Sequence, residues 1–183
     1  MDVCSPHGRR CPQGSFSASR VKKVLIVYHS KTGGTRQMAE AAARGAATES
    51  EIIVDLRHAR DAASVDLLAA DAYIFATPEN LAMISGIMKD FFDRTYYDVL
   101  DRIDGRPYVT LICAGSDGEN AARQIARICT GWKLKRVAEP VIVCTHAQTP
   151  ETILAPKTIP TNELARCEEI GATLAAGLTL GIY

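Results

Sequence analysis

The residues best suited to ligand chemistry in this chain form one short segment rich in hydroxyl groups and glycine: Ser30, Lys31, Thr32, Gly33, Gly34 and Thr35. An unbroken apolar run, residues 24–28, precedes the segment, and an alanine-rich stretch with apolar residues at helical spacing, residues 36–47, follows it. A strand, a turn and a helix in this order aim the turn amides and the positive end of the helix dipole at one point. The hydroxyls add donors there, and the glycines let the backbone approach closely. The pattern therefore predicts an anion site.

The spacing of this segment indicates which anion it binds. A dinucleotide fingerprint would read G-x-G-x-x-G and a nucleoside triphosphate loop G-x-x-x-x-G-K-[ST], and the segment matches neither. Its pattern, S-x-T-G-x-T, resembles the phosphate loop of flavodoxins and their relatives. That family holds the single phosphate of FMN with loop hydroxyls and amides, without a lysine or a metal, so the resemblance implies FMN as the cofactor. The alternative is a plain strand-to-helix turn in which Thr32 or Thr35 caps the helix.

A second segment of unusual composition follows the apolar run at residues 72–76: Thr77, Pro78, Glu79 and Asn80. It resembles the flavin-flanking loop of the FMN-dependent NAD(P)H reductases and quinone reductases of the flavodoxin superfamily. The resemblance implies that these residues line the isoalloxazine ring, although those relatives often continue with an aromatic residue and a glycine. The alternative is a loop that leads into a helix, with Asn80 as the cap and Leu81 and Met83 packed inward.

A third such segment ends the apolar run at residues 108–114: Ala114, Gly115, Ser116, Asp117 and Gly118. Its glycines expose backbone amides, and the resemblance implies contacts with the ribityl chain and the pyrimidine edge of the flavin. The alternative is a tight strand-to-helix connection in which Ser116 or Asp117 is the helix cap, and both interpretations can hold together.

Three residues near these segments are expected to be structural. Trp132 directly follows Gly131, where a helix is expected to end, and is interpreted as a packing anchor. His146 follows the last predicted strand, one strand away from the predicted site, and Cys113 is interpreted as a buried thiol. No Ser-His-Asp or paired-carboxylate arrangement follows from the spacing. We assign no catalytic side chain, because in flavin chemistry the cofactor carries the hydride or the electrons.

The elements that must position these segments alternate between strand and helix patterns. Strands are expected at residues 24–28, 51–56, 72–76, 108–114 and 141–144, and helices at 36–47, within 57–71, and at 84–100, 121–129 and 162–178. This alternation predicts right-handed crossovers and a parallel sheet. We expect an α/β fold, a flavodoxin-like doubly wound five-stranded parallel sheet of order 2-1-3-4-5 with helices on both faces. The loops after strands 1, 3 and 4 then meet at the switch point of the sheet.

Local residue types predict two further features near the C-terminus. The last helix is expected to begin with Thr161 or Asn162 as its N-cap and Glu163 in its first turn. Residues 146–161 hold three prolines and are interpreted as a loop.

Composition excludes several classes of protein. The chain has 183 residues, 47% of them apolar and 23% charged, which suits one soluble domain, expected at residues 21–183. Its 21 basic and 21 acidic residues cancel, so neither nucleic acid nor an anionic membrane is indicated as a partner, and no apolar run is long enough to span a membrane. Residues 1–20 are polar and are expected to be a flexible tail.

The six cysteines form no C-x-x-C pair and have no zinc-like spacing with histidine, which indicates a reducing, cytoplasmic setting. Cys4 and Cys11 beside His7 leave a metal or redox role of the tail open.

Two functions of different classes remain. The chain is either an FMN oxidoreductase, with NADPH or NADH as donor and a quinone, free flavin or similar small molecule as acceptor, or a flavodoxin-type electron carrier that docks with protein partners. Carrier flavodoxins tend to be acidic, which steers them to basic partners, and this chain is charge-balanced. The balance favours the oxidoreductase. A module that has lost FMN and binds only proteins is a third alternative, and the formation of homo-oligomers is left open.

Overall fold

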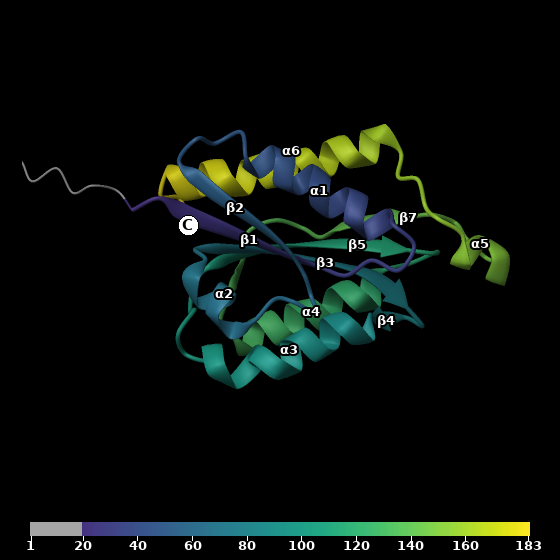
Figure 1. Ribbon diagram of the computed structural model, residues 1–183, viewed down its shortest axis with the longest axis horizontal. Coiled ribbons are helices and arrows are strands. Elements are labelled where there is room, and N and C mark those ends of the chain that lie inside the picture. Colours follow the sequence, from purple (N-terminus) through teal and green to yellow (C-terminus); the bar gives the residue numbers. More distant parts are fainter. Residues whose placement is uncertain (1–19) are drawn as a thin grey trace, which may run out of the picture.

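The computed structural model describes residues 20–183, in which strands and helices alternate along the chain (Figure 1). The strands are β1 (Lys22–Tyr28), β2 (Ile52–His58), β3 (Ala72–Asn80), β4 (Met83–Ile84), β5 (Pro107–Ala114), β6 (Lys135–Arg136) and β7 (Val141–Cys144). The helices are α1 (Gly34–Ala46), α2 (Ser64–Ala69), α3 (Gly86–Val99), α4 (Glu119–Gly131), α5 (Pro150–Leu154) and α6 (Thr161–Thr179). The predicted tail at residues 1–20, with Cys4, His7 and Cys11, lies outside the described residues except for Arg20.

The sheet has the predicted order. β1 pairs in parallel with β2 on one side and with β3 on the other, and β3 pairs in parallel with β5. β5 then pairs in parallel with β6 near its start and with β7 near its end, so β6 and β7 together form one interrupted fifth strand. The doubly wound parallel sheet of order 2-1-3-4-5 is therefore confirmed. The short antiparallel strand β4, which pairs with the end of β3, is a feature that the sequence does not predict.

Successive side chains of β1 pack on opposite faces of the sheet, as the period of a strand requires. Leu25 and Val27 belong to one buried apolar cluster, and Val24 and Ile26 belong to the other. Figure 1 shows α1 and α6 covering one face of the sheet and α2, α3 and α4 covering the other. All four side chains are fully buried, which explains why β1 is apolar throughout and does not alternate with polar residues.

Trp132 is a packing anchor, as predicted. Its ring is fully buried and stacks on Tyr96 with the ring centroids 5.8 Å apart, and its Nε1 donates to the Tyr96 carbonyl at 3.1 Å. The preceding Gly131 is the last residue of α4 and packs against the same tyrosine. A Cβ at Gly131 would lie 2.1 Å from the Tyr96 hydroxyl, so the position requires glycine for close approach and not for a left-handed cap.

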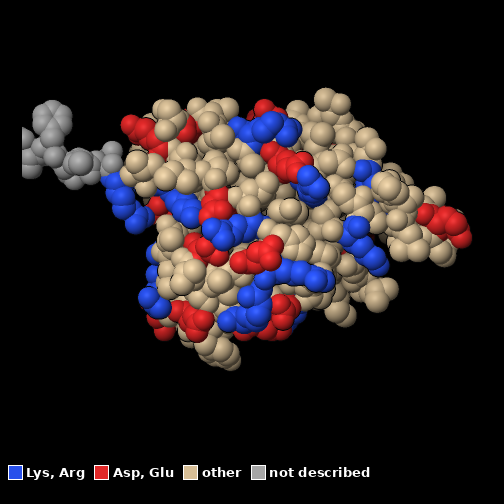
Figure 2. Space-filling view, in the orientation of Figure 1, with Lys and Arg blue, Asp and Glu red and all other residues tan. Residues whose placement is uncertain are grey.

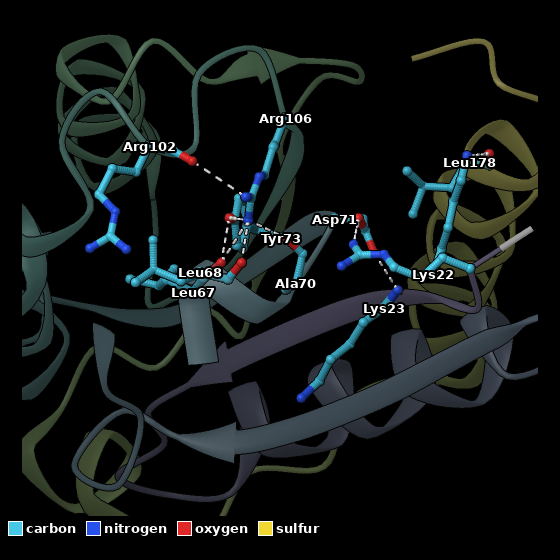
Figure 3. A network of polar contacts seen from close by, with 11 residues as sticks. Lys22, Lys23, Leu67, Leu68, Ala70, Asp71, Tyr73, Arg102, Arg106 and Leu178 are labelled. Carbon is cyan, nitrogen blue, oxygen red and sulfur yellow. Dashed lines mark hydrogen bonds and ion pairs between the residues drawn. The ribbon is translucent and has the colours of Figure 1, made fainter. Parts of the chain in front are cut away.

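Polar contacts hold the end of the sheet where the strands begin (Figure 3). Arg106, directly before β5, donates through Nη1 to the Leu67 carbonyl and to the Tyr73 hydroxyl, both at 3.0 Å. Asp71, directly before β3, accepts from the Lys23 amide of β1 at 2.8 Å. These contacts tie the starts of three parallel strands together. The loops at the opposite, carboxyl end are therefore free to form a site.

The start of α6 differs from the prediction. Pro160 is the N-cap residue and no side chain caps the helix, so the expected cap at Thr161 or Asn162 is wrong. Proline suits this position because its fixed φ fits the start of a helix and it has no N–H to satisfy. Glu163 lies in the first turn, as expected.

Residues 150–154 form the short helix α5 inside the segment that the sequence predicts as a loop. Thr149 caps this helix, since its hydroxyl accepts from the Thr152 amide at 3.3 Å, and Pro150 occupies the first turn. Figure 1 shows α5 projecting beyond the carboxyl end of the sheet. The segment therefore has local order at the edge where the site is predicted.

Charged side chains of both signs are interspersed over the face shown in Figure 2. The ion pairs of the described residues include Lys23 with Asp55 at 2.6 Å and Arg94 with Asp90 at 2.8 Å. Within residues 20–183, no helix is long and apolar enough to cross a membrane, and no three metal-ligating side chains converge.

Candidate functional site

The residues between β1 and α1, positions 30–35, form a tight turn that we call the anion loop. Gly33 is the N-cap of α1 and has φ 89°, a left-handed conformation that glycine adopts without strain. The Ser30 hydroxyl accepts from the Gly33 amide at 3.1 Å and so closes the turn. No side chain caps α1, and therefore the alternative in which Thr32 or Thr35 is the helix cap is wrong.

The anion loop keeps an unused donor in a buried place. Thr35 is only 1% exposed, and its hydroxyl has no hydrogen-bond partner in the structure. Leaving a buried polar atom unpaired costs free energy, and a ligand or an ordered water can supply the missing partner. The first turn of α1 contains no acidic residue, so its unpaired amides face no competing carboxylate within the helix.

Close packing fixes the position of the loop against β5. A Cβ at Gly34 would lie 2.6 Å from the Cys113 sulfur, so only glycine lets α1 start this close to the sheet. Burial raises the pKa of the Cys113 thiol to about 11, which makes it a poor nucleophile. The interpretation of Cys113 as a buried thiol is confirmed.

The second predicted segment is not a loop, which corrects the expectation for residues 77–83. Thr77, Pro78, Glu79 and Asn80 are the end of β3, which turns back through Leu81 and Ala82 into β4. We call residues 79–84 the hairpin. Leu81 has φ 52° and Ala82 has φ 60°, so two side-chain-bearing residues hold the left-handed conformation at its turn. Such strain persists where the surroundings enforce it, and it is often found at functional sites.

The hairpin also changes the roles expected for Thr77 and Asn80. Ser85, and not Asn80, is the N-cap of α3, because its hydroxyl accepts from the Met88 amide at 3.3 Å. Thr77 is fully buried, and its hydroxyl lies 3.2 Å from the Ser85 hydroxyl. Thr77 therefore connects the end of β3, next to the hairpin, to the N-cap of α3. Leu81 is 96% exposed and Met83 is 55% exposed, so the alternative in which both pack inward is wrong.

Glu79 joins the hairpin to the third predicted segment. Its Oε2 accepts from the Gly118 amide at 2.9 Å, whereas its other oxygen, Oε1, is buried and has no partner. Asn120 of α4 donates to the Ala82 carbonyl at 2.6 Å, which adds a second connection between the hairpin and α4. The Glu79 carboxylate is thus held in place with one acceptor left unused.

Gly118 is the N-cap of α4, so the alternative with Ser116 or Asp117 as the N-cap is wrong. Its φ of 90° favours glycine, and a Cβ would lie 2.5 Å from Cγ2 of Ile142. His146 lies beyond this segment, and its amide donates to the Gly115 carbonyl at 2.8 Å, which is a structural contact of the kind expected.

Two adjoining pockets open between these segments. A pocket of about 100 Å³ lies between the anion loop and the ends of β3 and β5, and a wider one of about 560 Å³ lies beside the hairpin. Both are lined by Lys31, Glu79, Asn80, Gly115, Ala147 and Ile153. The narrow pocket suits a small anion, and the volume of the wide one is typical of a site for a small organic molecule.

Most of the predicted site residues line one of the two pockets: Ser30, Lys31, Thr32, Thr35, Pro78, Glu79, Asn80, Ala114, Gly115 and Ser116. The others belong to the same three segments but line neither pocket: Gly33, Gly34, Thr77, Asp117 and Gly118.

Sequence reasoning missed the part of the lining that comes from residues 145–157: Thr145, Ala147, Gln148, Ile153, Leu154 and Lys157. Except for Thr145, these residues belong to the segment that contains α5, residues 146–160, which we call the strap. Thr145 directly precedes it. A signal was present in the sequence, because a threonine followed by a proline, as in Thr149-Pro150, is typical of a helix start.

Comparisons with known proteins find relatives that match part of this chain. Residues 59–149 match the family model described as NADPH-dependent FMN reductase. A flavodoxin of Aquifex aeolicus is 35% identical over 104 residues, which cover 57% of this chain and 55% of that protein. An NAD(P)H dehydrogenase (quinone) of Acidithiobacillus ferrooxidans is 34% identical, with 41% of this chain and 48% of that protein covered. The chain thus matches about half the length of these curated relatives.

Solved structures show the same fold at lower identity. A flavodoxin from the domain Archaea superposes with a TM-score of 0.70 at 21% identity and covers 86% of this chain and 99% of its own. A WrbA-like flavodoxin from Agrobacterium tumefaciens gives a TM-score of 0.68 at 20% identity, with 87% of this chain and 98% of its own covered.

Proposed function

Because the chain belongs to the flavodoxin-like superfamily, we propose that it binds FMN between the anion loop, the hairpin and residues 114–118. The bound FMN would serve NAD(P)H-dependent reduction of a small-molecule acceptor such as a quinone or a free flavin. In this proposal residues 21–183 are one FMN-binding domain. The observation that carries it is the pair of unpartnered buried atoms, the Thr35 hydroxyl and Glu79 Oε1, in the lining of the same cavity.

The residues present fit FMN at both ends of the molecule. At the narrow pocket, the hydroxyls of Ser30, Thr32 and Thr35 and the first amides of α1 are donors for a phosphate. At the wide pocket, the unused acceptor of Glu79 suits the ring N–H of a flavin, and Gly115 leaves backbone close to the cavity. The chain offers no second glycine-rich fingerprint for the adenine half of FAD.

When bound, FMN would supply the redox chemistry, and the protein would orient it and limit its contact with water. Asn80 and Ala82 lie along one side of the wide pocket, and Ile153 of α5 lies in its lining from the strap. Leu81, at the turn of the hairpin, lines the wide pocket and is 96% exposed, so the pocket reaches solvent on this side. Such an opening gives a nicotinamide and then an acceptor access to the same place.

A second candidate function, an electron carrier, is favoured by the tip of the hairpin. Leu81 is 96% exposed and lines the wide pocket, and Met83, on the other arm of the hairpin, is 55% exposed. An apolar tip next to a redox site suits docking of a partner protein. The balanced charge of the chain offers no electrostatic steering for such a partner, and for this reason we place the oxidoreductase first.

The visible spectrum of the purified protein tests the proposal. We expect the protein to bind FMN in preference to FAD, and we expect anaerobic NADPH or NADH to bleach the visible absorbance of the bound flavin. A protein that takes up no flavin, or takes up FAD instead, contradicts the cofactor assignment. If dithionite bleaches bound FMN while neither nicotinamide does, the carrier function replaces the oxidoreductase.

A further inference from the structure

The strap returns from β7 to the sheet edge and is bonded directly to the anion loop. The Lys157 amide donates to the Thr32 carbonyl at 2.8 Å. The side chain of Gln37 in α1 also bonds to the backbone of the strap. Its Nε2 donates to the Lys157 carbonyl at 2.6 Å, and its Oε1 accepts from the Ile159 amide at 3.1 Å. The backbone of Lys157 is therefore fixed against the loop by three hydrogen bonds around it.

The side chain of Lys157 begins next to the anion loop and lines the narrow pocket. Its Cβ lies 3.3 Å from the position that a Cβ at Gly34 would take. Its Nζ donates to the carbonyls at the end of α5, those of Thr152 at 2.5 Å, Ile153 at 3.0 Å and Ala155 at 2.7 Å. The ammonium thus caps α5, and the residue that carries it lines the pocket.

The charges around this pocket leave the Lys157 ammonium without an anionic partner. Among the described residues, Lys157 forms no ion pair with a carboxylate. The acidic residue in the pocket lining is Glu79, whose Oε2 already accepts from the Gly118 amide. Thr35, fully buried and with its hydroxyl unpartnered, lines the same pocket. An ammonium and an unused buried hydroxyl that share one small pocket are both suited to a phosphate.

We infer that the Lys157 ammonium is a direct ligand of the FMN phosphate. This inference rests on the proposed function and adds to it a cation from the strap. It departs from the flavodoxin resemblance, which implies a phosphate held by loop hydroxyls and amides without a lysine. The backbone of Lys157 is held against the anion loop, so in this inference a change of side-chain rotamer moves the ammonium from the α5 carbonyls to the phosphate. Because α5 also carries Ile153 and Leu154 into the lining, phosphate binding and the position of α5 are coupled through this one side chain.

Riboflavin provides the matched ligand for a test, because it has the ring and ribityl chain of FMN and lacks the phosphate. We would measure the Kd of both flavins by fluorescence quenching for the wild type, Lys157→Met and Lys157→Arg. The control is Lys133→Met, which removes a lysine that pairs with Asp101 and Asp104. The loss of a charge-assisted hydrogen bond in Lys157→Met should weaken FMN binding about tenfold or more. Riboflavin binding should stay within about twofold, and Lys157→Arg should keep most of the FMN affinity.

If Lys157→Met weakens both flavins equally or neither of them, Lys157 is only the cap of α5, and the inference is wrong. A wild type that binds neither flavin refutes the proposed function, and the inference fails with it. A measurement on the wild type covers the case in which the variants do not fold. FMN should protect Lys157 from an amine-directed label, detected by peptide mass spectrometry, and riboflavin should not. Equal labelling with the two flavins contradicts the inference.

Discussion

Two helices of this protein begin in the same backbone conformation at the same edge of the sheet. The start of α1 offers a ligand an unused hydrogen-bond donor, whereas the start of α4 offers an unused acceptor. Gly33 before α1 has φ 89° and ψ −17°, and Gly118 before α4 has φ 90° and ψ −16°. The Gly33 amide donates to the Ser30 hydroxyl, and no acidic residue lies in the first turn of α1. The Gly118 amide donates to the Glu79 carboxylate.

The comparison teaches that side chains, and not the backbone, decide the charge of the group that each helix start accepts. Both starts have amides that favour an anion. At α4 the anion is the Glu79 carboxylate of the protein itself. The part of the site beside α4, which we call the α4 half, therefore has an unused acceptor on Glu79 and suits a neutral hydrogen-bond donor. At α1 the unused atom is the Thr35 hydroxyl, so the part of the site beside α1, the α1 half, suits an anion. A molecule with a phosphate at one end and a ring N–H at the other satisfies both halves.

The largest difference between the two helix starts should appear in folding stability. Gly118→Ala forces a Cβ to within 2.5 Å of Ile142 in addition to the left-handed strain, so we expect the free energy of unfolding to fall by about 2–4 kcal/mol. Gly33→Ala meets no atom closer than 3.8 Å and should lose only the strain, about 1–2 kcal/mol. Urea denaturation of both variants without flavin measures the difference. Equal losses would mean that the packing around Gly118 relaxes freely.

The second prediction separates binding from stability at the α1 start. Thr35→Val removes a buried hydroxyl that has no partner, so the protein without flavin should be equally stable or more stable. FMN affinity should fall by about 1.5–3 kcal/mol, because one hydrogen bond to a charged phosphate is lost. Thermal unfolding and FMN titration measure the two effects, with riboflavin as the ligand that should not respond. A loss of stability without flavin would show that the hydroxyl has an internal role.

The sequence predicts the α1 half of the site better than the α4 half, for a physical reason. A hydroxyl and glycine turn between a buried strand and a helix depends on neighbours within six positions, so residues 30–35 reveal it directly. The role of Glu79 depends on Gly118, 39 positions away in the sequence, and on a hairpin turn formed by Leu81 and Ala82. Leucine and alanine are not typical of left-handed turns, so no local pattern predicts that β3 continues to Asn80 and folds back.

The sheet order could be predicted for a similar reason. Alternating apolar strands and helical patterns impose right-handed crossovers, and these leave few topologies. The strap could not be placed, because its position depends on contacts such as that of Lys157 with Thr32, which are remote in the sequence. Its prolines indicate irregular backbone but not where that backbone lies. The helix cap at Thr149 was the local signal of order in this segment.

The third prediction concerns the α4 half. In Glu79→Gln one of the two side-chain atoms becomes a donor, so the amide cannot accept from both Gly118 and a ring N–H. We expect FMN and riboflavin to lose affinity equally, by about 1–2 kcal/mol, which corresponds to a factor of about 5–30. Parallel titrations of the two flavins measure this. A loss confined to FMN would place the phosphate near Glu79 and would reverse the orientation of the cofactor in our proposal.

The smallest expected effect concerns Lys31, the other lysine in the pocket lining. Its side chain is exposed and forms no ion pair among the described residues, so water and salt screen its attraction to a phosphate. An exposed pair contributes about 0.2–1 kcal/mol, and Lys31→Met should therefore weaken FMN binding only about two- to fivefold. The difference between wild type and variant should disappear in 1 M salt, where the screening length is about 3 Å. Titrations at low and high salt, with riboflavin as the control, measure both points. A loss as large as the one we expect for Lys157→Met, and one that persists in high salt, would mean that the loop and not the strap supplies the cation for the phosphate.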